Sequence, residues 1–435
     1  MSSDRQSLKQ FSFSFILLLK VEMSVIFKRQ FHASCLNSFE EVLILSAART
    51  PVGKFNGTLK SVTAPQLGSI AISAALKRAG LISAGILKEV NEVYMGNVLQ
   101  ANEGQSPARQ AALGAGLPES TEATTINKVC ASAMKAIMQA SQAIQTHSAN
   151  VMVAGGMESM SNAPYYLPRS QAYGHFQAVD SIIKDGLWDV YGDIHMGICA
   201  ENTVKNMSLS REDQDEYAQE SYRRAIAAIN NGLFTDEIAP VTLKTRKGNS
   251  LVIEDEEPKS VSLDRLPTLR PAFHKEGTVT AGNASPINDG ASAIVLAAKS
   301  YLSHLQSFAV DVPISPIGRI ISFADAATTP IDFTIAPSIS IPRALERAGL
   351  AIADIAQFEI NEAFAAVALA NRNILGLDLA KVNVKGGAVA LGHAIGSSGC
   401  RIVVTLLHSL KPGEFGVAAI CNGGGGSSAV VVQRL

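Results

Sequence analysis

The stretch ALKRAGL at residues 75–81 returns as ALERAGL at residues 344–350, and this repetition decides the fold. In each copy an amphipathic helix ends near a glycine, and a short connection leads to a strand, as in ISAALKRAGLISAGILKEVNEVYMGNV (72–98) and SIPRALERAGLAIADIAQFEINEAF (340–364). The helical run from Cys130 followed by VMVAGG likewise matches the run after Ser397 followed by VAAICNGGG. The offset is 269 residues for the first pair and 266 residues between Gly155 and Cys421. A nearly constant offset across helix, strand and turn indicates an internal duplication.

The alternation of strands and helices predicts an α/β protein built from two duplicated, layered halves with mostly parallel sheets. We expect an N-terminal domain over residues 39–310 and a C-terminal domain over residues 311–435. Residues from about 160 to 275 differ in texture, since they are richer in charge, Pro and Gly and hold the only tryptophan, Trp188. We interpret them as an inserted loop domain that caps one face and carries substrate specificity.

Composition narrows the functional classes. The 435-residue chain is 47% hydrophobic and 17% charged, and its formal net charge is −1. Acids and bases are interspersed, so we expect no nucleic-acid partner and no membrane surface, and no apolar run reaches the length of a membrane span. Scattered cysteines favour free thiols in a reducing compartment, and neither H-E-x-x-H nor a Cys/His cluster predicts zinc. The five cysteines are Cys35, Cys130, Cys199, Cys400 and Cys421.

The first 38 residues have no clear place in this α/β pattern. From Met23 the sequence reads MSVIFKRQFHASCLNSF, with Lys28, Arg29, hydroxylated residues and no acid before Glu40. This composition is typical of a mitochondrial transit peptide, so we expect residues 1–38 to be a presequence and the protein to be mitochondrial. A cytoplasmic enzyme is the alternative.

Cys130 stands where a β-like run, TEATTIN, gives way to the helical run CASAMKAIMQASQAI. Cysteine is a small hydrophobic residue that packs well, and a lone cysteine before a helix favours that structural interpretation. A helix N-terminus also stabilises negative charge, so the thiol is alternatively a poised nucleophile. The rest of the chain decides between the two.

Four further stretches place polar or thiol groups at junctions after strands. NEAFAAV begins at Asn361, GGAVALGHAIGSSG contains His393, AICNGGGGSS contains Cys421, and IHMGICAEN carries His195 and Met196. In α/β sheets, sites form at the carboxyl ends of strands. Taken singly, each has an ordinary structural interpretation: a helix N-cap for Asn361, a turn residue for His393, a buried strand residue for Cys421 and a solvated loop residue for His195.

Together these groups suit acyl transfer through a thioester. A nearby histidine can activate a cysteine nucleophile, a second cysteine can move a proton, and glycine-rich turns expose N–H groups that stabilise an oxyanion. A cysteine hydrolase is the alternative, but the second cysteine and two glycine-rich turns fit condensation better.

The motifs NKVCASAMKA, VMVAGGMESMSNAPY, IHMGICAEN, TAGNASPINDGASA, NEAFA, GGAVALGH and CNGGGGSS resemble the thiolase family in family order, from about residue 41 to the end. The resemblance implies the five-layered αβαβα thiolase fold. The HMG triplet is similar to the short-chain type, which converts two acetyl-CoA into acetoacetyl-CoA and CoA, reversibly and by a ping-pong route. It implies CoA thioesters as substrates, no tightly bound cofactor, and a homotetramer or dimer. The rivals are a broad 3-ketoacyl-CoA thiolase of fatty-acid breakdown and a non-catalytic CoA- or lipid-binding protein.

The resemblance also assigns roles to residues. Cys130 would be the nucleophile that becomes acetylated, and His393 would activate it and help to form one oxyanion hole. Asn361 would hold the water that completes this hole, and Cys421 would abstract the α-proton of the second acetyl-CoA. The N–H groups of Cys130 and Gly423 would form the second hole. The positions that match the wall of the pantetheine tunnel are His195, Met196 and Ser285.

Two further sets rest on the resemblance alone. Some mitochondrial relatives bind potassium near this pocket, through a tyrosine and backbone carbonyls. The matching residues are Tyr222, Ala281, Gly282, Ala284 and Val389. The residues at positions where relatives contact the CoA nucleotide are Ser260, Val261, Ser262 and Arg265. This loop departs from the Arg-Val-Asp pattern of the mitochondrial type.

One departure lies close to the expected chemistry. The family usually reads G-H-P, and this chain reads Gly392-His393-Ala394. Proline restricts the unfolded chain and stiffens a turn. With Ala394 in its place we expect a working but less rigid turn, and a free energy of unfolding lower by roughly 0.4–1 kcal/mol.

Overall fold

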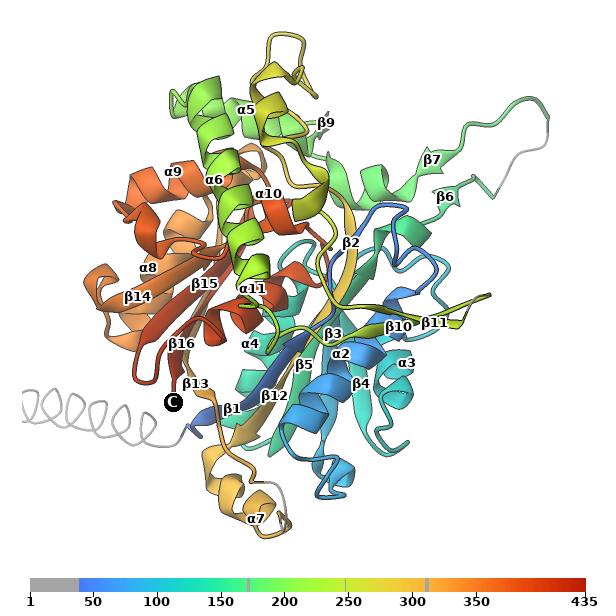
Figure 1. Ribbon diagram of the computed structural model, residues 1–435, viewed down its shortest axis with the longest axis vertical. Coiled ribbons are helices and arrows are strands. Elements are labelled where there is room, and N and C mark those ends of the chain that lie inside the picture. Colours follow the sequence, from blue (N-terminus) through green and yellow to red (C-terminus); the bar gives the residue numbers. More distant parts are fainter. Residues whose placement is uncertain (1–38, 170–172, 247, 310–312) are drawn as a thin grey trace, which may run out of the picture. The chain divides into compact units, whose positions relative to one another are not determined.

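The computed structural model describes residues 39–169, 173–246, 248–309 and 313–435. The presequence predicted over residues 1–38, with Cys35, lies outside these residues. Residues 41–435 form one compact unit around a large mixed sheet (Figure 1). Its strands are β1 (Val42–Arg49), β2 (Gly53–Lys54), β3 (Glu92–Gly96), β4 (Glu122–Ile126), β5 (Val151–Ser159), β12 (Asn288–Ala298), β13 (Gly318–Ala327), β14 (Ile355–Ile360), β15 (Phe415–Asn422) and β16 (Gly426–Arg434).

The order of the strands confirms the duplication. The sheet runs β14-β15-β16-β13-β1-β12-β5-β3-β4, with β2 paired to β12. The run β14-β15-β16-β13 in the second half therefore repeats the run β3-β5-β12-β1 in the first. The halves meet where β1 and β13 pair antiparallel through Val42–Ile44 and Gly318–Ile320. We refer below to β1–β12 as the first half and to β13–β16 as the second half.

The predicted excess of parallel pairs is wrong. Among the strand pairs of the main sheet in the described residues, β3–β4, β3–β5 and β14–β15 are parallel, while β1–β12, β1–β13, β5–β12, β13–β16, β15–β16 and β2–β12 are antiparallel. Helical crossovers do make most strands of each half run in one direction. One strand of each half, β12 in the first and β16 in the second, runs in the opposite direction between two of these strands. It is therefore antiparallel to both of its neighbours.

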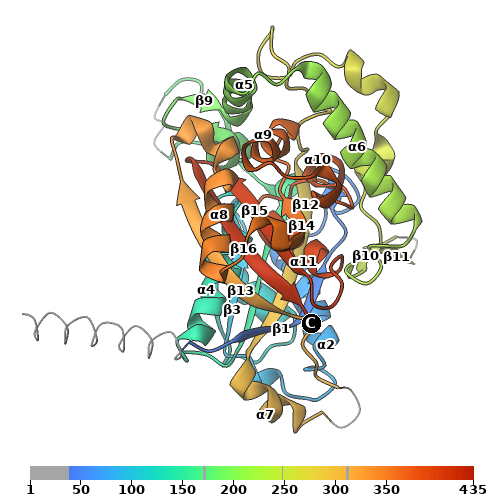
Figure 2. The ribbon, with the colours of Figure 1, turned by 90° about the vertical axis from the view of Figure 1, so that its left-hand side faces the viewer.

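Helices form layers on both faces and between the two halves (Figure 2). The helices α2 (Ala64–Arg78) and α3 (Pro107–Gly114) share one apolar core with the first half, and α8 (Pro337–Ala348) and α9 (Ala365–Leu375) share another with the second. Between them lie α4 (Ser132–Gln145) and α11 (Ser398–Leu407), whose apolar side chains pack in one core with strands of both halves. This five-layered arrangement confirms the predicted fold class.

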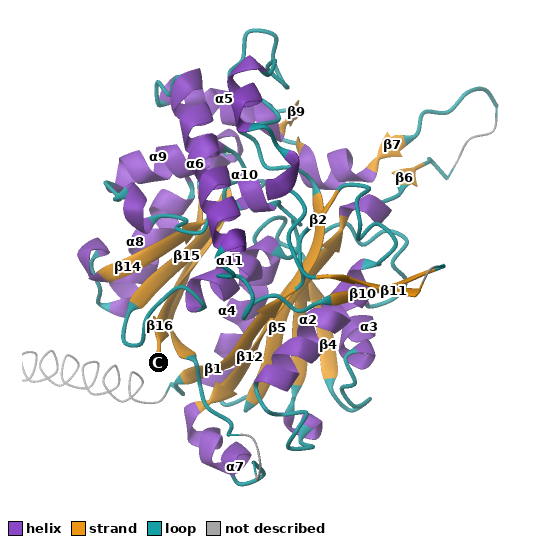
Figure 3. Ribbon diagram, viewed as in Figure 1, coloured by secondary structure: helices purple, strands orange, loops and turns teal. Residues whose placement is uncertain are grey.

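A long connection, residues 160–287, separates β5 from β12 and lies outside the main sheet (Figure 3). Its two longest helices are α5 (Met196–Asn206) and α6 (Arg211–Asn230). Its short strands are β6 (Tyr165–Tyr166), β7 (Val179–Asp180), β8 (Trp188–Asp189), β9 (Ile194–His195), β10 (Val241–Thr245) and β11 (Gly248–Val252). Two small α-helices, α7 (Leu302–Gln306) and α10 (Ala388–Leu391), lie outside this connection. None of the helices in the described residues is both long and apolar enough to cross a bilayer.

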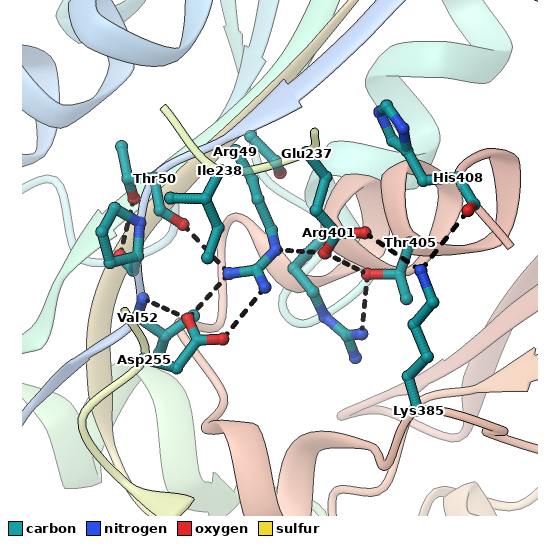
Figure 4. A network of polar contacts seen from close by, with 12 residues as sticks. Arg49, Thr50, Val52, Glu237, Ile238, Asp255, Lys385, Arg401, Thr405 and His408 are labelled. Atoms are coloured by element: carbon teal, nitrogen blue, oxygen red, sulfur yellow. Dashed lines mark hydrogen bonds and ion pairs between the residues drawn. The ribbon is translucent and has the colours of Figure 1, made fainter. Parts of the chain in front are cut away.

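A buried network of charged and polar side chains links the long connection to both halves (Figure 4). Arg49, at the end of β1, forms ion pairs with Glu237 at 2.6 Å and Asp255 at 2.7 Å, and its side chain is 1% exposed. Glu237 also accepts a hydrogen bond from Thr405 of α11 at 3.0 Å. A buried guanidinium is stable only with such partners, so the long connection has a fixed position against the sheet.

Candidate active site

One cavity of about 420 Å³ reaches from the long connection to both halves of the sheet. Cys130 lines it from the first half, and Phe364 and His393 line it from the second. The long connection supplies most of the remaining wall, including His195, Met196, Phe273 and Ser285. Five of the sequence-predicted residues, Cys130, His195, Met196, Ser285 and His393, therefore meet at one apolar cavity although they lie far apart in the chain.

Cys130 lies in a tight loop between β4 and α4, two residues before the helix starts at Ser132. Val129 has a φ of +49°, a left-handed conformation that is unusual for a β-branched residue. Lys128 anchors the loop, because its ammonium contacts Asp325 of β13 at 2.5 Å and Ser428 of β16 at 2.8 Å. The nucleophile predicted in the first half is thus held in position by the second half.

The electrostatics of Cys130 differ from the poised thiolate that its place near a helix predicts. Burial raises the pKa of the Cys130 thiol to about 12, although the backbone N–H groups of Cys130 and Gly423 face the sulfur and lower the pKa. The buried carboxyl of Glu158 raises it further. Desolvation therefore outweighs the favourable dipoles, and the thiol is protonated at neutral pH.

His393 lies in a buried loop between α10 and α11. Its backbone N–H donates to Oδ1 of Asn288 at 2.8 Å, and the preceding Gly392 has a φ of +104°. A Cβ at Gly392 would stand 2.6 Å from the Asn288 side chain, so only glycine fits there. Burial, assisted by the charge of Arg401, lowers the pKa of His393 to about 3. The imidazole is therefore neutral and able to accept a proton.

The imidazole has one polar neighbour at each nitrogen. Nδ1 lies 2.6 Å from Oγ of Ser398, and Nε2 lies 3.5 Å from Nδ2 of Asn361. Asn361 directly follows β14, as the sequence predicts, and its Oδ1 is buried without a hydrogen-bond partner among the described residues. An unsatisfied buried oxygen beside a histidine nitrogen is suited to hold a water molecule.

Cys421 lies near the end of β15, just before the glycine turn at residues 423–425. Its side chain is fully buried. Burial raises the pKa of the Cys421 thiol, and the neighbouring Cys130 raises it further. The two thiols, one from each half, are therefore near enough for their charges to interact.

Comparison with known proteins decides the family. The thiolase N-terminal domain model matches residues 42–300, and the thiolase C-terminal domain model matches residues 314–434. The chain belongs to the thiolase family.

Individual thiolases are similar over nearly the whole chain. An acetyl-CoA acetyltransferase of Yarrowia lipolytica is 58% identical over 392 residues, which cover 90% of this chain and 96% of that protein. A mitochondrial acetyl-CoA acetyltransferase of Gibberella zeae is 55% identical over 401 residues, 91% of each chain. The crystal structure of the Acat5 thiolase from Ascaris suum in complex with coenzyme A has a TM-score of 0.85 and 46% identity, covering 91% of this chain and all of that one.

The cavity wall in this thiolase includes the tunnel residues predicted from the family. His195 is the N-cap of α5, with Nδ1 accepting from the N–H of Gly197 at 3.0 Å, and its ring stacks on Phe273 at 4.7 Å. Ser285 donates to the carbonyl of Ala363 at 2.9 Å. The wall is therefore apolar except for a few oriented groups.

The predicted potassium ligands lie at or beside the cavity, whereas the predicted contacts of the CoA nucleotide lie outside it. Tyr222 and Val389 pack in one buried cluster, Ala281 and Ala284 line the cavity, and Gly282 packs against Leu266 of that cluster. By contrast, Ser260, Val261, Ser262 and Arg265 do not line the cavity, and all except the half-buried Val261 are exposed.

Sequence reasoning missed three residues that shape the site. Asn288 and Ser398 hold His393, and Phe273 supports His195. Asn288 begins strand β12 and Ser398 begins helix α11, and no spacing pattern marks either residue. Only the folded chain shows their partners.

Proposed function

We propose that the protein is an acetyl-CoA acetyltransferase that joins two acetyl-CoA molecules into acetoacetyl-CoA and CoA, and also catalyses the reverse thiolysis. The observation that carries this proposal is the meeting of the Cys130 thiol and the neutral His393 imidazole at one apolar cavity, with the buried Cys421 thiol near enough to Cys130 for their charges to interact. The names of the similar proteins from Yarrowia lipolytica and Gibberella zeae support it.

In the first step, Sγ of Cys130 attacks the thioester carbonyl of acetyl-CoA while His393 accepts the thiol proton. Because the resting thiol and imidazole are both neutral, proton transfer accompanies the attack. The forming oxyanion is stabilised by His393 and by a water molecule held at Oδ1 of Asn361. The S–C bond to CoA then breaks, and the proton leaves with the CoA thiol.

In the second step, Cys421, as its thiolate, removes an α-proton from the second acetyl-CoA. The resulting carbanion attacks the acetyl carbon on Cys130, while the N–H groups of Cys130 and Gly423 stabilise the oxyanion. The S–C bond to Cys130 then breaks and releases acetoacetyl-CoA, and the Cys421 thiol returns the proton to the Cys130 thiolate. Both N–H groups already face the Cys130 sulfur in the resting site. Because the charges of Cys421 and Cys130 interact, the group that removes the α-proton lies near the acetylated sulfur, and the carbanion forms close to the acetyl carbon that it attacks.

The decisive experiment measures CoA-dependent loss of acetoacetyl-CoA and of 3-ketopalmitoyl-CoA by the full chain and by Cys130→Ala. Rapid loss of the short substrate alone, abolished in Cys130→Ala, is expected. Cys199→Ala is the matched control, since it removes a buried thiol that does not line the cavity. Equal use of the long substrate would make the protein a broad 3-ketoacyl-CoA thiolase. No turnover by folded protein would favour a non-catalytic CoA- or lipid-binding role.

We further propose a potassium ion beside the cavity, held by Tyr222 and carbonyls of Ala281, Gly282, Ala284 and Val389. In support, the Tyr222 side chain is 2% exposed. The carbonyls of Ala281, Gly282 and Ala284 accept no hydrogen bond from the described part of the chain. Such oxygen ligands suit a hard cation. Potassium should raise the thermal midpoint over sodium, and Tyr222→Phe should abolish this difference; equal midpoints in both salts would contradict the site.

The nucleotide end of CoA is proposed to lie over Ser260, Val261, Ser262 and Arg265, outside the cavity. Exposure of this segment supports the proposal, because a charged nucleotide is better accommodated at the surface than in an apolar tunnel. Arg265→Ala should raise KM for acetyl-CoA and leave kcat nearly unchanged. A change confined to kcat would place the nucleotide elsewhere.

Location and assembly complete the proposal. The mitochondrial location predicted from the sequence is confirmed by similar proteins from Gibberella zeae, Aspergillus fumigatus and Rattus norvegicus, which are named mitochondrial. We infer a transit peptide over residues 1–38, domains over 39–310 and 311–435, and an insertion over about 160–275.

We also propose a homotetramer, which light scattering would test. Exposed apolar side chains on the long connection support this proposal. These are Tyr165, Leu167, Phe176, Val190 and Tyr191.

A further inference from the structure

Ser398, the first residue of α11, contacts two groups at once. Its Oγ lies 2.6 Å from Nδ1 of His393 and 2.9 Å from the carbonyl oxygen of Ala394. The residue is buried, with an exposed fraction of 3%, so bulk water does not compete for either contact. The hydroxyl carries a single proton, and the two contacts therefore constrain each other.

The carbonyl of Ala394 can only accept a hydrogen bond, so the 2.9 Å contact requires the Ser398 hydroxyl to donate to it. The lone pairs of Oγ then face Nδ1 of His393, and a hydrogen bond at 2.6 Å requires that Nδ1 carries a proton. In the opposite arrangement two oxygens would face each other without a proton between them. A neutral imidazole has only one N–H, so Nε2 keeps its lone pair.

The other side of the ring agrees with this assignment. Nε2 is approached by Nδ2 of Asn361, which is a donor group. The backbone of His393 is also fixed, because its N–H donates to Asn288, and Asn288 in turn donates to the carbonyl of Gly53 at 3.0 Å and to Glu257 at 3.1 Å. Main chain and ring of His393 are thus held by separate partners.

We propose that Ser398 is a positioning residue that holds His393 as the Nδ1–H tautomer, so that the Nε2 lone pair is available to the Cys130 thiol. This inference rests on the proposed acetyl transfer. When the Cys130 proton moves to Nε2, the imidazolium still donates from Nδ1 to Ser398, whose hydroxyl still donates to Ala394. As Sγ of Cys130 bonds to the acetyl carbon and the bond to CoA breaks, the proton passes from Nε2 to the CoA thiolate. Ser398 itself neither gains nor loses a proton.

The chain offers a matched control in the neighbouring residue. Ser397 is equally buried at the start of α11, but its Oγ contacts Oγ of Ser292 at 2.9 Å instead of His393. Ser398→Ala should lower kcat and the rate of Cys130 acetylation roughly 10- to 100-fold with little change in KM. Ser397→Ala should keep wild-type kcat. Ser398→Thr, which retains the hydroxyl, should recover most of the rate.

A direct readout uses nitrogen NMR of the full-length wild-type protein labelled at histidine, with His393→Asn to assign the signals. The wild type should show a protonated Nδ1 and a bare Nε2 at His393, and Ser398→Ala should show a mixture of tautomers. A protonated Nε2 in the wild type, or equal kcat in Ser398→Ala and Ser397→Ala, would overturn the proposal. Wild-type turnover of acetoacetyl-CoA, measured in parallel, shows separately whether the proposed activity holds.

Discussion

The two halves differ most in the connection that leads into their reversed strand. In the first half residues 160–287 separate β5 from β12, whereas in the second half residues 423–425 separate β15 from β16. The long connection supplies His195, Met196 and Phe273 to the cavity wall. The short one turns through Gly424 and Gly425, both with φ above +80°, and aims the N–H of Gly423 at Cys130.

This difference shows that the two halves of a duplicated fold contribute different groups to one site. Both connections leave the same position of the shared strand order, yet one supplies most of the cavity wall and the other approaches the Cys130 sulfur. The helix starts differ in a similar way, since Cys130 precedes α4 and His393 precedes α11. Neither half alone contains the proposed nucleophile, the proposed base and both groups of the proposed oxyanion site.

The largest expected effect comes from Cys421, at the short connection. Cys421→Ala should lower the rates of condensation and thiolysis by about 10⁴-fold, because it removes the group that moves the α-proton. It should still allow transfer of one acetyl group to Cys130, which mass spectrometry of the protein detects. Cys400→Ala removes an equally buried thiol of α11 and should leave both steps nearly intact. Loss of acetylation in Cys421→Ala would contradict the division of roles between the halves.

The long connection depends on the buried Arg49 network. Arg49→Leu should lower the free energy of unfolding by about 3 to 5 kcal/mol, since Glu237 and Asp255 would remain buried without their cation. Urea unfolding measures this change. Arg223→Leu, which removes a largely exposed ion pair with Glu220, should cost at most about 1 kcal/mol. Similar losses in the two variants would show that the network does not hold the connection.

The buried imidazole predicts a pH dependence of stability. The folded pKa of His393 is about 3, below its usual value of about 6.5, so between these values the unfolded chain binds a proton that the folded chain does not. Lowering the pH through this window should therefore destabilise wild type relative to His393→Asn, by up to roughly 1.4 kcal/mol per pH unit. Urea midpoints at pH 7 and pH 5 test the sign.

The smallest effect concerns the turn after His393. No hydrogen bond from the N–H of Ala394 is found among the described residues, so proline can replace it without losing a bond. Ala394→Pro should stabilise the fold by about 0.4–1 kcal/mol by restricting the unfolded chain. Calorimetry would reveal the gain, and a destabilised variant would mean that the loop geometry excludes proline.

The sequence determined the duplication, the α/β class and the junctions that bear Cys130, Asn361, His393 and Cys421. These features follow from local periodicity and from motif spacing, which the linear chain preserves. The expectation of mostly parallel sheets failed because strand direction follows from each connection, whereas strand adjacency depends on how β12 and β16 insert between other strands.

Only the tertiary structure decided the electrostatics and the partners of the site. A helix start predicts a lowered thiol pKa, yet burial raises the pKa of Cys130 to about 12. Asn288 and Ser398 acquire their roles from positions in space that no sequence pattern records. Local chemistry can be read along the chain, but desolvation and long-range hydrogen bonds exist only after residues from both halves and the long connection have come together.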